Sequence, residues 1–202
     1  MNIVCSDLEG VFVPEVWINV ALKTGIEELK LTTRDISDYD VLMKRRLAIL
    51  AEHHLTIRDI TDVIATIDPL DGAVELLDWL RRQAPVIIVS DTFTQFAGPL
   101  MEKLKMPALF CNALIIGDNG AVTGYALRQK DGKKKTVQAL KTLNYRVTAM
   151  GDSYNDISML KEADCGILFR PPKNVVAEFP EFPVVTDYAT LKTKLSESLA
   201  LP

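Results

Sequence analysis

The segment NIVCSDLEG, residues 2–10, begins with a short apolar run, NIVCS at 2–6. The run stops before two carboxylates, Asp7 and Glu9, and Gly10 directly follows them. An apolar run of this length without polar alternation is typical of a strand that is buried on both faces, as in a parallel sheet. Acids at the carboxyl end of such a strand lie at the rim of the sheet, where open α/β folds bind their ligands. The segment therefore predicts a parallel sheet with a site at its edge.

The rest of the chain alternates strands with helices. Further apolar runs with the length of buried strands lie at 85–90, 146–151 and 165–169. The helical patterns between and after them cover 72–83, 93–104, 133–143 and 155–162. Two strand-like arms within 114–129 flank Asp118-Asn119-Gly120, which is typical of a β-hairpin. This order predicts an α/β fold with a doubly wound, Rossmann-like parallel sheet and helices on both faces.

One segment breaks the alternation after the first strand. From Glu15 to about Asp68 the pattern is helical only, with helices expected over 15–24, 39–53 and 56–66. Thr56 is expected to cap the last of them. We therefore expect a catalytic core over residues 1–14 and 70–202, and a small helical cap over residues 15–69 inserted after the first strand.

The composition favours a globular protein that acts on small molecules. The chain has 202 residues, a net charge of -4 and scattered basic residues, so neither a nucleic-acid surface nor a membrane surface is expected. It has no signal-peptide pattern and no apolar stretch near the ~18 residues of a membrane span, so we expect a cytoplasmic protein. Cys5, Cys111 and Cys165 lack C-x-x-C spacing and are expected to be buried thiols, not a disulfide or a zinc site.

Acids and hydroxyl groups follow each of the predicted core strands that would meet at the rim. The strand 85–90 ends at Ser90, followed by Asp91 and Thr92. The strand 146–150 runs into GDSYND, residues 151–156, which contains Asp152 and Asp156. Taken singly, a strand-end Asp is more often a cap or turn residue than a catalyst. Their repeated occurrence at strand ends favours a shared site.

The three aspartates at these ends predict a metal site. Asp7, Asp152 and Asp156 would repel one another in a partly buried cluster unless a cation lay among them. Carboxylate oxygens suit Mg²⁺, which prefers to share its coordination with a phosphate. Lys133 could offset the charge of a phosphate and of an ionised nucleophile, although KKK at 133–135 is also typical of a solvated helix start.

Four motifs in this order resemble those of the haloacid dehalogenase superfamily of phosphohydrolases: DLEGV (7–11), VSDT (89–92), KDGKKK (130–135) and GDSYND (151–156). The helical insertion, with PEVW and YDVLMKRRLAIL, resembles the phosphoserine phosphatase group, and especially its branch that also passes the phosphoryl group to homoserine. The resemblance implies a Mg²⁺-dependent phosphatase of a small phosphorylated amino acid, most readily phosphoserine, that works through an aspartyl-phosphate.

The resemblance also assigns roles within the core. It makes Asp7 the nucleophile and Glu9 the general acid and base, with Lys133 as the catalytic lysine and Lys134 as its rival. It places Mg²⁺ on Asp7, Asp152 and the backbone carbonyl of Glu9, with Asp156 behind them. The superfamily's phosphatases normally have Asp where this chain has Glu9; the reference pKa is similar, but the extra methylene changes where the proton is delivered.

Substrate recognition is expected from both the core and the cap. By resemblance, Glu15 would bind the substrate ammonium and Arg46 its carboxylate, while Ser90 and Lys133 would bind the phosphate. The expected substrate-binding residues are Glu15, Arg46, Ser90, Asp91, Thr92, Lys133 and Asn155.

Other functions remain open at this point. They are a phosphatase of another small phosphometabolite, a phosphorylatable receiver-like signalling module, and a catalytically inactive binding module. A receiver would not carry a cap of roughly fifty residues, and the retained acids and lysine argue against an inactive module. The expected partner is a small phosphorylated substrate, with a homodimer left open.

Overall fold

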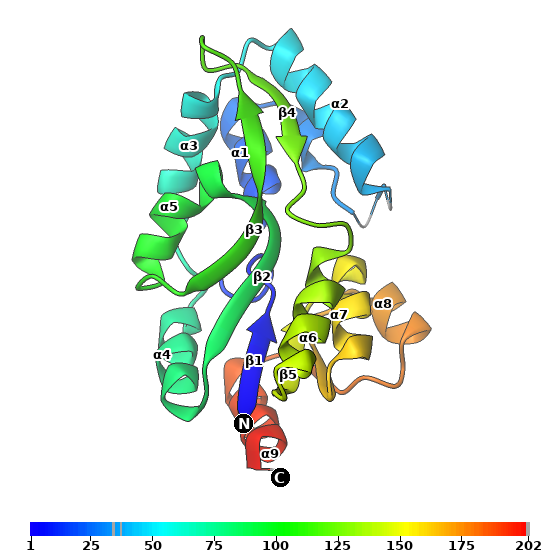
Figure 1. Cartoon of the computed structure of the whole chain (residues 1–202). Coiled ribbons are helices and arrows are strands. Elements are labelled where there is room, and N and C mark those ends of the chain that lie inside the picture. The colour runs from blue at the N-terminus through cyan, green and yellow to red at the C-terminus, as the bar shows by residue number, and fades with distance from the viewer. Residues whose placement is uncertain (34, 37, 201–202) are drawn as a thin grey trace.

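The computed structural model describes residues 1–33, 35–36 and 38–200. Within these residues the sheet has seven strands in the order β4-β3-β2-β1-β5-β6-β7 (Figure 1). The strands are β1 (Asn2–Ser6), β2 (Val86–Phe93), β3 (Ala108–Ile116), β4 (Val122–Ala126), β5 (Arg146–Gly151), β6 (Cys165–Phe169) and β7 (Val184–Val185). The β3–β4 pair is antiparallel and the other pairs are parallel.

The strand order reverses at β1, which pairs in parallel with β2 on one side and β5 on the other. From β1 the chain first builds the sheet outward through β2 and β3, and later through β5, β6 and β7. The crevice at such a reversal is where doubly wound sheets bind ligands. The predicted fold class is confirmed, and the acids that follow β1 and β5 lie beside this crevice.

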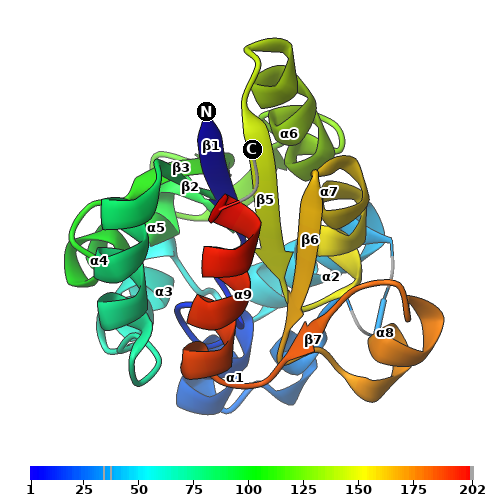
Figure 2. The ribbon, with the colours of Figure 1, turned by 90° about the horizontal axis from the view of Figure 1, so that it is seen from below.

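Helices cover both faces of the sheet (Figures 1 and 2). They are α1 (Val16–Thr24), α2 (Tyr39–Glu52), α3 (Ile57–Ala65), α4 (Ala73–Gln83), α5 (Thr94–Lys103), α6 (Gly132–Thr142), α7 (Ile157–Glu162), α8 (Lys173–Glu178) and α9 (Tyr188–Ala200). Because side chains alternate along a strand, Val4 packs in the core with α4, α5 and α9, whereas Ile3 and Cys5 pack with α6 and α7.

The segment between β1 and α4 forms α1, α2 and α3, as the pattern predicted. Thr56 and Asp59 form a capping box at the start of α3. The β3–β4 hairpin lies beside α2, where Tyr125 of β4 donates to Asp40, and Thr56 bridges to Ala121 (Figure 1). The division into a core over 1–14 and 70–202 and a cap over 15–69 stays a prediction, since this hairpin of the predicted core packs on the predicted cap.

Two strands differ from the prediction in ways that matter for the site. β2 continues to Phe93, past the predicted end at Ser90, and its pairing with β3 is irregular between Val89 and Phe93. β3 begins at Ala108 and joins the central sheet before it turns into the hairpin. Both differences arise from strand pairing, which the local sequence does not reveal.

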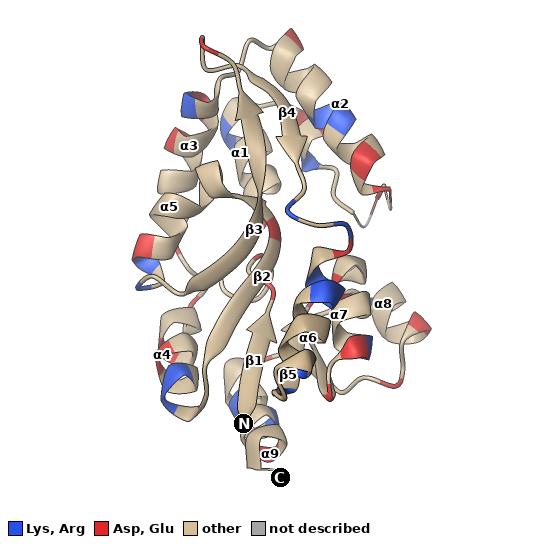
Figure 3. Ribbon diagram, viewed as in Figure 1, with Lys and Arg blue, Asp and Glu red and all other residues tan. Residues whose placement is uncertain are grey.

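Charged residues of both signs are interspersed over the helices in the view of Figure 3, with Lys and Arg also on the loop between β4 and α6. None of the helices formed by the described residues has the length and apolar character that crossing a membrane requires. Cys5, Cys111 and Cys165 are free thiols, and Cys5 and Cys111 are buried.

Candidate active site

Asp7 lies at the rim between β1 and β5. Its backbone N–H donates to the carbonyl of Met150 at 3.0 Å, so the chain stays paired with β5 one residue beyond β1. The residue is only 4% exposed. Gly10 then turns the chain with a φ of +75°, and a Cβ there would lie 2.6 Å from the Cγ of Asp152. Only glycine allows the backbone to pass this close to the second acid.

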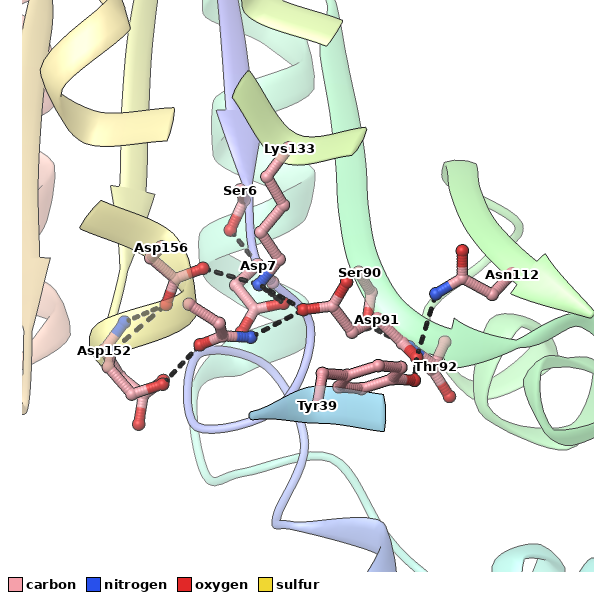
Figure 4. A network of polar contacts seen from close by, with 12 residues as sticks. Ser6, Asp7, Tyr39, Ser90, Asp91, Thr92, Asn112, Lys133, Asp152 and Asp156 are labelled. Carbon is pink, nitrogen blue, oxygen red and sulfur yellow. Dashed lines mark hydrogen bonds and ion pairs between the residues drawn. The ribbon is translucent and has the colours of Figure 1, made fainter. Parts of the chain in front are cut away.

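A buried lysine meets the acids that follow β1 and β5. Asp7, Asp152 and Asp156 each offer a carboxylate oxygen, and these oxygens lie within 4.8 Å of one another. The Nζ of Lys133, a residue 3% exposed in the first turn of α6, lies 3.0 Å from Asp7 Oδ1 and 2.6 Å from Asp156 Oδ1. Figure 4 shows this side chain reaching between the two carboxylates. Two buried acids therefore contact one buried ammonium, and a third buried acid, Asp152, lies close to both of them.

Asp156 orders this cluster. Its Oδ2 accepts hydrogen bonds from the backbone N–H groups of Asp152, at 2.9 Å, and Ser153, at 3.1 Å, while its Oδ1 binds Lys133. A Cβ at Gly151 would lie 2.3 Å from Asp156 Cγ, so the loop after β5 also depends on glycine. Asp156 thus fixes both the loop that carries Asp152 and the position of the lysine.

Lys134 does not join the cluster. Its side chain is 42% exposed, and its Nζ lies 4.0 Å from Glu162 Oε2 on the outer side of α7. Of the two rival lysines, the structure places Lys133 among the acids.

The charges in the cluster do not balance. Burial and then Asp156 raise the pKa of Asp7 well above its usual value, although Lys133 opposes them. Burial lowers the pKa of Lys133, but Asp156 and Asp7 outweigh this effect, so its pKa lies well above its usual value. A divalent cation among the carboxylates would balance the excess negative charge, and the all-oxygen donor set suits a hard cation. The residues present therefore fit a metal site.

The hydroxyl groups after Val89 lie on a β-bulge. The irregular β2–β3 pairing between Val89 and Phe93 leaves residues 90–92 outside the regular ladder, and Ser90, Asp91 and Thr92 line the same cavity at the rim. Ser90 Oγ accepts the backbone N–H of Thr92 at 3.1 Å. The buried Oγ1 of Thr92 has no hydrogen-bond partner among the described residues. A buried hydroxyl without a partner is costly unless a ligand or water satisfies it.

Asp91 connects several parts of the site. Its Oδ2 accepts a hydrogen bond from Asn155 Nδ2 at 2.8 Å and lies 3.9 Å from Lys133 Nζ. Its backbone carbonyl accepts the hydroxyl of Tyr39 at 3.0 Å and Asn112 Nδ2 at 3.4 Å (Figure 4). Sequence reasoning missed Tyr39 and Asn112, and no local signal could have found them, because each reaches Asp91 from a separate element.

Glu9 lies where the chain leaves β1 for α1. Its Oε2 accepts the backbone N–H of Val16, the first residue of α1, at 2.8 Å. Burial and then Glu15 raise the pKa of Glu9 to about 8, against the lowering effects of this hydrogen bond, Arg46 and Lys133. The raised pKa favours the protonated carboxyl group, which can donate a proton to a leaving group.

Arg46 is a buried cation supplied by the helical insertion. It is 7% exposed, and its guanidinium lies 4.6 Å from the ring centroid of Trp17 and donates to the carbonyl of Leu31 at 2.9 Å. Its Nε has no hydrogen-bond partner among the described residues. Burial lowers the pKa of Arg46 to about 10, while Glu9 raises it, so it stays charged at neutral pH. A buried, partly unsatisfied guanidinium suits a carboxylate ligand.

The predicted site residues converge on two adjoining cavities. A cavity of about 60 Å³ is lined by Asp7, Glu9, Glu15, Arg46, Ser90, Asp91, Thr92, Asp152 and Asn155. A neighbouring cavity of about 260 Å³ shares Ser90, Asp91 and Asn155 and adds Lys133. Asp156 lies directly behind Lys133. Each residue predicted for the site lies in it or against it, although their individual roles stay predictions.

Comparison with known proteins agrees with this geometry. The family model for haloacid dehalogenase-like hydrolases matches residues 6–164. The chain is 58% identical over 205 residues to a protein of Pseudomonas aeruginosa named phosphoserine phosphatase ThrH, covering 100% of both chains. It is 57% identical over 192 residues to a phosphoserine phosphatase of Pseudomonas syringae pv. tomato, covering 95% of this chain and 81% of the relative.

Solved structures give the same result. A phospho-aspartyl intermediate analogue of phosphoserine phosphatase matches with a TM-score of 0.75 and 25% identity, over 96% of this chain and 98% of that chain. The fold, the family model and the two relatives all agree, so the chain belongs to the haloacid dehalogenase-like hydrolases and, within them, to the phosphoserine phosphatase family.

Proposed function

We propose that this protein is a Mg²⁺-dependent phosphoserine phosphatase that works through an aspartyl-phosphate on Asp7. The observation that carries the proposal is the cavity that Asp7 shares with Glu9, Glu15 and Arg46. The cavity combines a nucleophile, Asp7, and a proton donor, Glu9, with one anionic and one cationic side chain. These two charges match the ammonium and the carboxylate of an α-amino acid. The two relatives named phosphoserine phosphatase support the same substrate.

The reaction follows from the positions of Asp7 and Glu9. A carboxylate oxygen of Asp7 attacks phosphorus, the bond from phosphorus to the serine oxygen breaks, and Glu9 gives its proton to that oxygen. The Glu9 carboxylate then takes a proton from water, whose oxygen attacks phosphorus and releases inorganic phosphate and Asp7. Glu9 can start this cycle protonated because its pKa is about 8.

Mg²⁺ would be held by Asp7, Asp152 and the backbone carbonyl of Glu9, with Asp156 behind them. When bound, it would supply positive charge that balances the acids and the phosphoryl oxygens. Lys133 contributes further positive charge, since its Nζ lies 3.0 Å from Asp7 Oδ1. Ser90, the unsatisfied hydroxyl of Thr92 and Asn155 are the further donors that we assign to the phosphate.

Recognition of the amino acid rests on the insertion after β1. Arg46 would bind the substrate carboxylate through its fork, including the Nε that has no partner among the described residues. Glu15 lines the same cavity and would bind the ammonium group. A phosphometabolite without these charges would lose both contacts.

Phosphate release from phosphoserine, measured with and without EDTA, tests this function. We expect Mg²⁺-dependent release, loss of release with EDTA, and recovery when Mg²⁺ is added back. A receiver-like module would be phosphorylated without multiple turnovers, and a binding module would release nothing. Either result would contradict the proposal.

We also propose that homoserine accepts the phosphoryl group. The pair of opposite charges in the cavity, Glu15 and Arg46, favours this activity, because homoserine differs from serine by one methylene. Such a difference discriminates by only ~1–3 kcal/mol. The homoserine hydroxyl oxygen would attack phosphorus, Glu9 would take its proton, and the bond to Asp7 would break.

The transfer is tested by ³¹P NMR of phosphoserine, Mg²⁺ and excess homoserine with the protein. We expect a phosphohomoserine signal that grows with homoserine concentration at the expense of inorganic phosphate, because a bound acceptor outcompetes water. Inorganic phosphate as the sole product at every concentration would contradict transfer and leave the hydrolytic function intact.

A further inference from the structure

Asp91 places a negative charge among the groups that we assign to the phosphate. It directly follows Ser90, its Oδ2 accepts a hydrogen bond from Asn155 Nδ2 at 2.8 Å, and the same oxygen lies 3.9 Å from Lys133 Nζ. Its side chain is 39% exposed and lines both cavities. An ionised carboxylate has no proton to donate to a phosphate, so this arrangement calls for another explanation.

The Asp91 carboxylate uses the same donors that a phosphate needs. Lys133 is already engaged by Asp7 and Asp156, and Asp91 adds a third acid near it (Figure 4). Asn155 has two amide N–H groups, and its bond to Asp91 engages one of them, which leaves only the other for a phosphate. In addition, a phosphate dianion bound at these donors lies close to the Asp91 charge and is repelled by it.

We propose that Asp91 weakens the binding of free inorganic phosphate at this site and so promotes release of the product. This inference rests on the proposed phosphatase function. The substrate retains its contacts to Glu15 and Arg46, whereas inorganic phosphate has only the phosphate donors. Repulsion that both ligands experience therefore leaves the substrate bound and the product weakly held. The phosphoryl group on Asp7 is covalently attached, so the repulsion cannot expel it during turnover.

A purely structural role for Asp91 predicts no gain in phosphate affinity when its charge is removed. The contacts that fix its place in the β2 bulge, from Tyr39 and Asn112, are made to its backbone carbonyl and do not need the carboxylate. Asp91→Asn removes the charge and keeps a carbonyl oxygen that can accept from Asn155. If the carboxylate only supported its neighbours, this change would leave phosphate affinity unchanged or weaken it. If its charge repels phosphate, affinity rises.

The experiment is calorimetric titration of inorganic phosphate into the wild-type protein and into Asp91→Asn, both with Mg²⁺. We expect the dissociation constant to fall about tenfold in Asp91→Asn, since a partly exposed charge is screened but lies within a few Å of the anion. The inhibition constant of phosphate in phosphoserine hydrolysis should fall by the same factor.

Asp131→Asn is the matched control. Asp131 lines the larger cavity near Lys133, but its Oδ1 is held by Ser158 at 2.7 Å. Its φ of +53° is one that asparagine also tolerates, so the change removes a nearby charge without strain. We expect the phosphate dissociation constant of this variant to stay within about twofold of wild type, because the Asp131 carboxylate is bound by Ser158 and not by the groups that we assign to the phosphate.

An equal or weaker phosphate affinity in Asp91→Asn would overturn the inference, as would an equal gain in Asp131→Asn. Far-UV circular dichroism checks folding, and Asp91→Ser, which also removes the charge, replaces Asp91→Asn if that variant does not fold. If only Asp91→Asn shows measurable phosphate binding, the inference is supported. If neither the wild type nor the variant binds phosphate, the inference is overturned. Absence of phosphoserine turnover in the wild type contradicts the proposed function, whereas turnover with unchanged phosphate affinity contradicts only the role of Asp91.

Discussion

Replacing Arg46 by alanine should reduce turnover of phosphoserine far more than turnover of phosphoethanolamine, which lacks only the carboxylate. Arg46 is 7% exposed, and its Nε has no hydrogen-bond partner among the described residues. A substrate carboxylate bound there forms a largely desolvated pair with the guanidinium. The variant would leave that carboxylate buried without its partner, which is the costly way to break such a pair.

The size of the effect follows from the burial of Arg46. Loss of one partner of a buried, hydrogen-bonded charge pair costs ~2–5 kcal/mol. We take ~3 kcal/mol, because Glu9 and Glu15 already interact with Arg46 and offset part of its charge. With ~1.4 kcal/mol for each factor of ten, kcat/KM for phosphoserine should fall roughly 150-fold more than kcat/KM for phosphoethanolamine.

The ratio between the two substrates removes the effects that they share. Arg46→Ala also removes the contact with Trp17 and the bond to the Leu31 carbonyl, and it raises the pKa of Glu9 by removing a nearby cation. These changes alter both reactions alike. Phosphate release is therefore measured for both substrates, with thermal unfolding as a check on stability.

Arg45→Ala is the matched control, because Arg45 adjoins Arg46 on α2 but is exposed. Its effect should be small on both substrates. Arg46→Lys should fall between wild type and Arg46→Ala for phosphoserine, since lysine keeps the charge but not the planar fork. Equal losses on the two substrates in Arg46→Ala would refute the reasoning and leave Arg46 as a structural arginine.

Three further changes test the core of the site. Asp7→Asn should abolish phosphate release with unchanged circular dichroism, since an amide cannot form the acyl-phosphate; a variant with about a tenth of the wild-type rate would contradict this role. Because the pKa of Glu9 is about 8 and its protonated form is the donor, kcat/KM should fall as pH rises through about 8. A bound cation moves this fall to a lower pH. In Glu9→Gln this fall of kcat/KM at high pH should disappear, and the rate should be ~10²–10⁴-fold lower than in wild type. If the fall persisted in the variant, this would argue against Glu9 as the donor. Gly10→Ala should weaken Mg²⁺ binding in calorimetry, because its Cβ would lie 2.6 Å from Asp152 Cγ, whereas Gly25→Ala, with a similar φ and nothing within 4 Å, should not.

The local sequence was sufficient for several of the elements and for the kinds of residue in the site. The apolar runs at β1, β5 and β6 became strands over the predicted residues, because burial on both faces of a parallel sheet requires such runs. Thr56 and Asp59 became the capping box that their spacing allows. The acids after β1 and β5 met at one rim, since parallel neighbours end at the same edge.

Contacts between distant elements were decided only by the tertiary structure. Tyr39 from the insertion and Asn112 from β3 both reach the carbonyl of Asp91, and nothing near either residue in the sequence indicates it. The irregularity at residues 90–92, which line the cavity, depends on the register between β2 and β3. Register is a property of the pair of strands, so one strand alone does not determine it.

The two rival lysines show the same division. The motif KDGKKK predicted a lysine near the phosphate and favoured Lys133, but it left Lys134 as a rival. In the structure Lys133 is buried against Asp7 and Asp156, while Lys134 is exposed beside Glu162. Successive residues on an α-helix differ by about 100° in direction. The choice between them therefore depends on the rotation of α6 against the sheet, where Val137 and Leu140 pack in the core.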